Sequence, residues 1–223
     1  MPSHNATASC RATHVGPSAQ TSFVGYVMTT NPSSVRTQRT VALLASLNIS
    51  TRLFAAVHAT SNSEPDKVRS NLMTQRAIYD TVARQHSEPK DEYVLIFEDD
   101  VMVAPGIPSQ IVRRLLACGA HLSLKHSLPM FYAGSCGPIG ARNASLDPAA
   151  GVYALRDPHI AVRVSGRCAH AYAVRRRNAP MLRDLADRQP NRGHERFHQS
   201  YYMDVQLDHL AQQHTAFISS PPR

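Results

Sequence analysis

A short apolar run that leads directly into three acidic residues constrains the fold of this chain more than any other feature. Tyr93 to Phe97 carry no charge and are mostly branched or aromatic, and Glu98, Asp99 and Asp100 follow at once. Such a run is typical of a strand that is buried on both faces, as strands are in parallel sheets. Open α/β sheets bind ligands at the carboxyl ends of their strands, so the acids lie at the edge where chemistry is usually done.

Three carboxylates at one strand end repel one another unless a positive group lies among them. A hard divalent cation that also binds substrate phosphates satisfies such a cluster. This interpretation predicts chemistry on a nucleotide-linked substrate. The alternative is that Glu98, Asp99 and Asp100 only begin a solvated loop, and the residues alone leave both interpretations open.

Strand-like and helix-like segments alternate along the first half of the chain, which predicts an α/β fold. The expected strands are residues 22–30, 51–57, 93–97, 130–133, 168–174 and 215–219. The expected helices are residues 35–47, 70–85, 108–118, 178–187 and 199–212. Residues 62–66 are expected to form a turn and residues 143–157 a loop.

At 223 residues the chain is long enough for one sizeable hydrophobic core, and we expect a single domain over residues 21–223. Residues 1–20 are small and polar and are expected to form a flexible tail. The chain has no run of 18 apolar residues, so no transmembrane segment is predicted.

The formal net charge is +8, and arginines are concentrated between Arg163 and Arg196. A positive balance suits phosphorylated ligands, acidic membrane surfaces or nucleic acid. The chain has no zinc-finger spacing, and its aromatic residues do not interleave with the arginines as single-strand binding requires. Nucleic acid is therefore not an expected partner.

The four cysteines, Cys10, Cys118, Cys136 and Cys168, contain no CxxC pair, which argues against a zinc ribbon or a redox motif. Three glycosylation sequons begin at Asn5, Asn48 and Asn143, and they do not decide the compartment.

Six short segments lie in a characteristic order over residues 22–219. They are residues 26–30 with Arg36 and Arg39, 70–79, 95–101, 131–136, 168–174 with Ala179, and 203–205. In this order they resemble glycosyltransferase family 25, the group that contains lipopolysaccharide and procollagen galactosyltransferases. The chain departs from that pattern where residues 28–32 replace the usual Asn-Leu-Asp-Arg start, and it has no Trp for sugar stacking.

The resemblance implies a GT-A type fold, which is a Rossmann-like mixed sheet flanked by helices. Residues 21–104 would form the half that binds the nucleotide sugar, and residues 105–223 the half that binds the acceptor. Glu98-Asp99-Asp100 would stand in for the Asp-x-Asp motif, with Asp100 holding Mn²⁺ or Mg²⁺ on the donor diphosphate. Glu98 would approach the ribose or uracil, and Asp99 would support the metal site or face a donor sugar hydroxyl.

Further roles follow from the same resemblance. Thr29, Thr30 and Arg36 would lie beside the nucleotide, where the Arg guanidinium can bind phosphate with two hydrogen bonds. The alternative is that Thr29 and Thr30 only end a strand and that Arg36 lies on a solvated helix face. Inverting transfer needs a carboxylate base for the acceptor hydroxyl, and Asp204 matches the family position. The alternative for Asp204 is an exposed helix acid.

Histidines and cysteines carry the remaining expectations. His209 or His214 would complete the metal shell, as a late His does in many GT-A enzymes, although a lone His is more often structural. His170 is either a core histidine or an acceptor contact. Cys136 and Cys168 resemble paired positions in some relatives and are expected either to bridge or to stay reduced.

These observations predict a metal-dependent transferase that moves galactose or glucose from a UDP-hexose to a hydroxyl of a glycan, lipopolysaccharide or glycoprotein. One alternative is a degenerate transferase-like domain that binds glycan or a partner without turnover. Another is a divalent-metal nucleotidyltransferase or phosphodiesterase. A eukaryotic chain would work in the lumen of the secretory pathway, and any other chain in the cytoplasm.

Overall fold

The computed structural model describes residues 22–103, 107–125, 129–133, 152–154, 161–163, 170–187 and 217–220. Its elements in chain order are β1 (Phe23–Thr29), α1 (Val35–Ser46), β2 (Ile49–Ala55), α2 (Glu64–Ala83), β3 (Tyr93–Glu98), α3 (Ser109–Lys125), β4 (Met130–Tyr132), β5 (Val152–Ala154), β6 (Ala161–Arg163), β7 (Ala171–Arg175), the 3₁₀ helix η3 (Arg176–Asn178), α4 (Ala179–Asp187) and β8 (Phe217–Ser220). The expected tail over residues 1–20 and the expected helix over residues 199–212 lie outside the described residues.

The strands form one mixed sheet in the order β2-β1-β3-β7-β4-β8-β6-β5. β1 pairs in parallel with both β2 and β3, whereas β7 runs antiparallel between β3 and β4. β4 is parallel to β8, and β6 is antiparallel to β8 and β5. The chain is therefore an α/β protein with a mixed sheet flanked by helices, as predicted, and the arrangement is compatible with a Rossmann-like fold.

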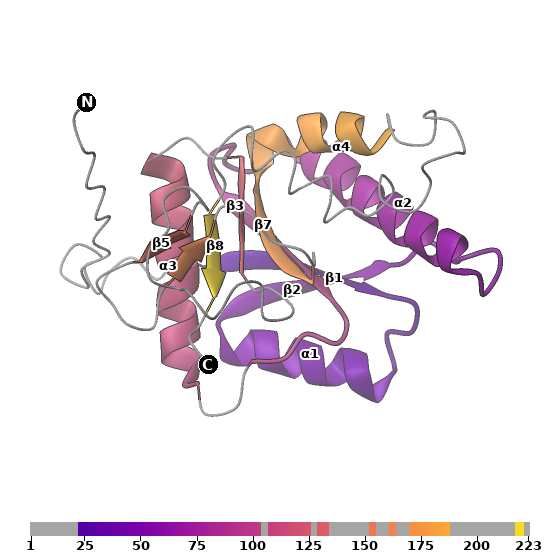
Figure 1. Cartoon of the computed structure of the whole chain (residues 1–223), viewed down its shortest axis with the longest axis horizontal. Helices are drawn as coiled ribbons and strands as arrows, with labels where there is room; N and C mark the ends of the chain where they lie inside the picture. Colours follow the sequence, from indigo (N-terminus) through magenta and orange to yellow (C-terminus); the bar gives the residue numbers. More distant parts are fainter. Residues whose placement is uncertain are drawn as a thin grey trace.

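Helices cover both faces of the sheet, so the protein has two apolar cores (Figure 1). Along β3, Val94 and Ile96 face the core under α2 and α4. Tyr93, Leu95 and Phe97 face the core under α1 and α3. This alternation is the period of two that a strand imposes on its side chains, and it accounts for the uninterrupted apolar run in the sequence.

In the order β2-β1-β3, a topological switch point lies between β1 and β3. After β1 the chain passes through α1 to β2 on one side, and it then returns through α2 to β3 on the other side. The two helices lie on opposite faces of the sheet. A crevice therefore forms beyond the carboxyl ends of β1 and β3, which is where open α/β sheets bind ligands.

Gly25 allows the three parallel strands to pack closely with their neighbours. A Cβ at this position of β1 would lie 2.9 Å from Ile49 Cγ2 and 3.0 Å from Phe97 Cε2. The glycine is thus required by the close approach of side chains from β2 and β3.

Helix α1 begins at the expected residue and ends one residue earlier than expected. Ser34 is its N-cap, and the Ser34 Oγ accepts a hydrogen bond from the backbone N–H of Thr37 at 3.1 Å. Asn48, two residues after the helix, has a φ of 59°, a left-handed conformation that Asn adopts more readily than most residues. Thr40 of this helix is buried.

Several predicted boundaries are also wrong. Helix α2 begins at Glu64, within the expected turn, because Ser63 caps it by accepting from the backbone N–H of Asp66. Helix α3 continues to Lys125, and β5 lies in the expected loop. β5 and β6 are three residues long, too short for a periodic pattern, and they are defined by their pairing.

Cys118 on α3 is buried and takes part in a disulfide. The expected pairing of Cys136 with Cys168 lies outside the described residues.

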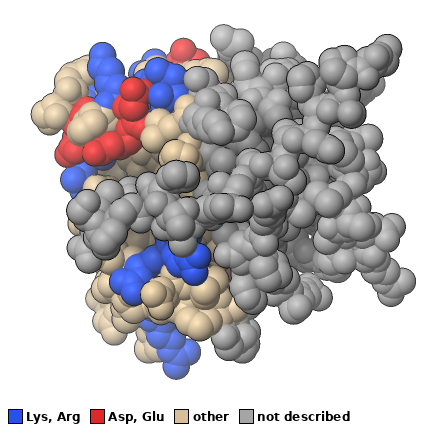
Figure 2. All heavy atoms as spheres, turned by 90° about the vertical axis from the view of Figure 1, so that its left-hand side faces the viewer, with Lys and Arg blue, Asp and Glu red and all other residues tan. Residues whose placement is uncertain are grey.

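None of the described helices is both long and apolar enough to cross a membrane. Figure 2 shows the face at the left of Figure 1, where Lys and Arg side chains lie beside acidic ones in its upper part and alone in its lower part. On the described part of this face, the positive charge is spread over separate groups.

Candidate functional site

The end of β3 sends its acidic side chains in different directions. Glu98 continues the alternation of Val94 and Ile96, so it faces α2, whereas Asp99 faces α1. Asp100 follows the strand and is exposed. The three consecutive acidic residues thus have different surroundings.

Asp99 is anchored by α1 and β1. It is only 7% exposed, and its Oδ2 accepts hydrogen bonds from Thr29 Oγ1 at 3.0 Å and Thr37 Oγ1 at 3.4 Å. Arg36 Nη2 lies 2.6 Å from Asp99 Oδ1, and Thr40 Oγ1 donates to the Asp99 backbone carbonyl at 2.9 Å. A buried carboxylate with this many donors has a fixed position, so Asp99 holds the start of α1 against the end of β3.

Glu98 has partners on both of its carboxylate oxygens. Asn71 Nδ2 donates to Oε1 at 3.2 Å, and His170 Nδ1 contacts Oε2. The backbone N–H of Glu98 also donates to the backbone carbonyl of His170 at 2.9 Å. His170 reaches this place because β7 is antiparallel to β3 with Phe97 opposite Ala171, which sets Glu98 and His170 across from each other.

These contacts change the ionisation of Glu98. Burial raises the pKa of Glu98, but the hydrogen bond and charge of His170 lower it, and Asn71 and Arg36 add to that effect. The net result is a pKa below the ordinary value of 4.5. Glu98 is therefore a carboxylate at neutral pH, able to pair with a cation.

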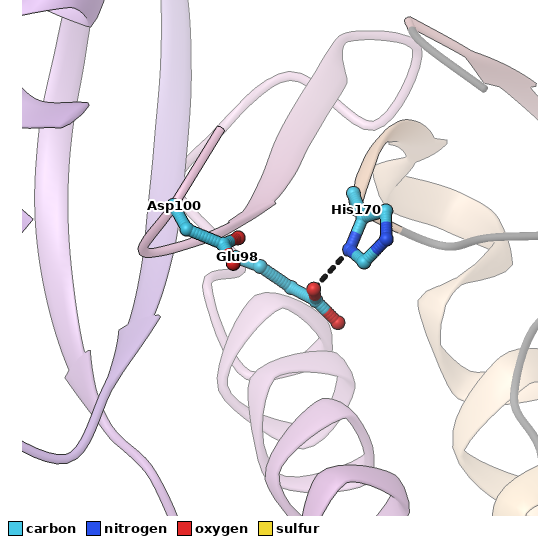
Figure 3. A group of neighbouring side chains, drawn as sticks. All are labelled: Glu98, Asp100 and His170. Carbon is cyan, nitrogen blue, oxygen red and sulfur yellow. Dashed lines mark hydrogen bonds and ion pairs between the residues drawn. The ribbon is translucent and has the colours of Figure 1, made fainter. Parts of the chain in front are cut away.

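Glu98, Asp100 and His170 form a cluster of possible metal ligands (Figure 3). One ligand atom from each lies within 4.8 Å of the others. The cluster combines two carboxylates with one imidazole, and its members come from the end of β3 and the residue that precedes β7. The side chains of Glu98 and His170 point toward each other in Figure 3.

A cleft of about 400 Å³ opens beside this cluster. Its lining includes the three acids and two basic residues, Arg36 of α1 and Lys67 of α2. The other lining residues are Met28, Thr29, Thr30, Ala56, Val57, Ala59, Ser70, Asn71 and Thr74. Its volume falls in the range of small-molecule sites, and both signs of charge face its interior.

Arg36 balances the acidic charge of the cleft. Besides its contact with Asp99, it lies 3.8 Å from Asp100 through Nη1 and Oδ2. Its side chain is 60% exposed, so it is free to contact a ligand in the cleft as well.

The sequence of this chain matches no model of a known protein family and no curated protein. The resemblance to glycosyltransferase family 25 therefore remains a prediction.

The structure brings together most of the residues that the sequence predicts for the site. Thr29, Thr30, Arg36 and the three acids all line the cleft. Asp204, His209 and His214 lie outside the described residues, so the expected base and the expected late metal ligands stay predictions.

The sequence alone did not place several residues of the site. The interpretation of His170 as a core histidine is wrong, because its side chain is 47% exposed beside Glu98. Lys67 was missed because α2 begins earlier than its apolar pattern indicates. Asn71 lies within the expected helix, but its contact with Glu98 depends on packing between elements, which no local pattern encodes. The alternation along residues 168–174 was the available signal for His170, since it places His170 and Tyr172 on one face.

Proposed function

We propose that this protein is a metal-dependent glycosyltransferase that moves galactose or glucose from a UDP-hexose to a hydroxyl acceptor, with inversion. The observation that carries the proposal is the cluster of Glu98, Asp100 and His170 beside a cleft that also holds Arg36 and Lys67. A nucleoside diphosphate site requires acidic side chains that bind a divalent cation and basic side chains that bind phosphate. The family resemblance of the sequence supports the same assignment.

The ligand set fits a divalent transition metal. Carboxylate oxygens suit Mn²⁺ and Mg²⁺ alike, whereas an imidazole nitrogen suits transition metals better than Mg²⁺. Glu98, Asp100 and His170 would hold the ion, and this assignment favours Mn²⁺. When bound, the ion stabilises the negative charge that builds on the departing nucleotide diphosphate.

The remaining groups of the cleft suit the donor. Arg36 and Lys67 supply positive charge for the diphosphate, and Thr30 offers an exposed hydroxyl at the end of β1. Asp99 keeps Arg36 close to the metal ligands through the contact at 2.6 Å. The expected acceptor is a glycan, lipopolysaccharide or glycoprotein, and Asp204 is the proposed base.

The acids of the cleft argue against the nucleotidyltransferase or phosphodiesterase alternative. Within the described residues, Glu98, Asp99 and Asp100 are the only carboxylates that line it. Asp99 is already bound by two threonines and Arg36. The described lining therefore lacks a further carboxylate that could bind a second metal ion.

Turnover tests the proposal directly. We expect the protein to release UDP slowly from UDP-galactose or UDP-glucose in Mn²⁺, because water can replace the acceptor. Asp100→Asn should lower the rate by at least about 100-fold, since it removes a charged ligand at a site of metal-assisted transfer. Asp184→Asn changes an exposed acid of α4 in the same way and should keep the wild-type rate.

The rates of UDP release also separate the alternatives. Binding of UDP with Mn²⁺ but no release from either sugar would favour the degenerate domain. Faster hydrolysis of other phosphodiesters would favour the phosphodiesterase. Equal rates in wild type and Asp100→Asn would contradict the proposed metal site.

A further inference from the structure

A line of buried polar side chains runs from the core to Glu98. Asn71, Gln75 and Tyr79 occupy every fourth position of α2 and so lie on one face of that helix. Tyr172 joins them from β7, on the same face of the sheet as His170. Gln75, Tyr79 and Tyr172 are each no more than 1% exposed.

Hydrogen bonds connect the members of this line without a break. Asn71 Nδ2 donates to Glu98 Oε1 at 3.2 Å, and Gln75 Nε2 donates to Asn71 Oδ1 at 2.5 Å. Tyr172 Oη donates to Gln75 Oε1 at 2.7 Å. Tyr79 Oη lies 2.7 Å from Tyr172 Oη and 3.4 Å from Gln75 Oε1.

The direction of the line is dictated by Glu98. An ionised carboxylate only accepts hydrogen bonds, so Asn71 must turn its NH₂ group toward it. The carbonyl of Asn71 then faces Gln75, which must present its own NH₂ group. The carbonyl of Gln75 then accepts hydrogen bonds from the tyrosine hydroxyls, which are the donors at that end of the line.

We propose that Gln75 and Tyr172 are positioning residues, which hold Asn71 in the orientation that donates to Glu98 and thereby fix the Glu98 carboxylate for its cation. The metal part of this inference rests on the proposed function. With Oε1 held by Asn71, the second oxygen, Oε2, is directed to the side where His170 lies. Buried hydrogen bonds in series strengthen one another, so removing one member weakens the last bond.

A purely structural role for the line makes a different prediction. Gln75 would then serve only to satisfy buried polar groups between α2 and β7, and its loss would lower stability without affecting Glu98 or the metal. Stability alone does not separate the two roles. The orientation of Asn71 and the affinity for Mn²⁺ do.

Two measurements on the full-length protein test the proposal. The first is hydrogen exchange of the Asn71 side-chain NH₂, followed by NMR without metal. The second is the affinity for Mn²⁺ alone, measured by calorimetry. In Gln75→Leu we expect Asn71 protons to exchange at least about tenfold faster and Mn²⁺ to bind about tenfold more weakly, as is usual when partners of metal ligands are removed.

Two tyrosine variants test the same inference even if Gln75→Leu does not fold. Tyr172→Phe should act more strongly than Tyr79→Phe, because only the Tyr172 hydroxyl lies at 2.7 Å from Gln75. Val82→Ala is the matched control, since Val82 is buried on the same helix and in the same core. It should lower stability and leave both readouts at the wild-type values.

The outcomes separate this inference from the proposed function. Unchanged Asn71 exchange in folded Gln75→Leu and Tyr172→Phe would overturn the positioning role. Faster exchange together with no Mn²⁺ binding by the wild type would support the positioning of Asn71 and contradict the metal site. Equal effects of Val82→Ala and Gln75→Leu on Mn²⁺ affinity would also overturn the inference.

Discussion

Glu98 and Asp99 are neighbours in the chain, yet the strand turns their side chains to opposite faces of the sheet. Asp99 is fixed by threonines and Arg36, whereas Glu98 lies with His170 and the more exposed Asp100. The alternation of side chains along a strand therefore separates Asp99, which holds α1 in place, from Glu98, which lies in the proposed metal site. Two neighbouring acidic residues can have different roles because their side chains lie on opposite faces of the sheet.

The lowered pKa of Glu98 predicts a dependence of stability on pH at this residue. A carboxyl group whose pKa is lower in the folded state contributes stability above the unfolded-state value and loses it as pH falls through the folded-state value. As the pH falls below 4.5, the wild type should lose more stability than Glu98→Gln does. Urea unfolding of both proteins across this range measures the difference.

A neutral exposed residue supplies the control for that experiment. Ser22→Ala, just before β1, adds and removes no titratable group and should follow the wild-type dependence on pH. Parallel curves for the wild type and Glu98→Gln would contradict the contacts assigned to Glu98.

At the scale of elements, the site is a product of strand order. β1 and β3 are adjacent and parallel, so the residues that follow them meet at one edge, between helices that lie on opposite faces. β7 then brings His170 beside Glu98 from the opposite direction. The cleft depends on these three strands keeping their present spacing.

A change at Gly25 tests that packing. A Cβ in Gly25→Ala would lie 2.9 Å from Ile49 Cγ2 and 3.0 Å from Phe97 Cε2, so these side chains, or the strands that carry them, must shift. Overpacking of this kind costs about 1–3 kcal/mol, to be measured by urea unfolding. Ser22→Ala, at an exposed position just before β1, should change the free energy of unfolding by less than about 0.5 kcal/mol. Equal values for the two variants would contradict the close approach.

The sequence predicts the elements of the parallel half better than the rest, for physical reasons. β1 and β3 are nearly continuous apolar runs, and α1 lies between two clear signals, Ser34 at its start and Asn48 just after its end. The place of β7 beside β3 depends on pairing between residues far apart in the chain, which no local pattern encodes. Thr29, Arg36 and the acids could thus be predicted for the site, whereas the approach of His170 to Glu98 could not.

At the scale of the whole molecule, one sheet joins both parts of the chain. β7, from the part expected to bind the acceptor, lies between β3 and β4. The division into halves at residue 104 stays a prediction. The net charge of +8 favours a negatively charged ligand such as a nucleoside diphosphate.

Binding of UDP, measured by calorimetry, tests the central claim most directly. The account predicts that UDP binds in Mn²⁺, that EDTA abolishes the binding, and that Asp100→Ala abolishes it even with Mn²⁺ present. Asp184→Ala, on the exposed side of α4, should bind as the wild type does. Absence of UDP binding in Mn²⁺, or binding that survives both EDTA and Asp100→Ala, would contradict a metal-dependent nucleotide site at Glu98, Asp100 and His170.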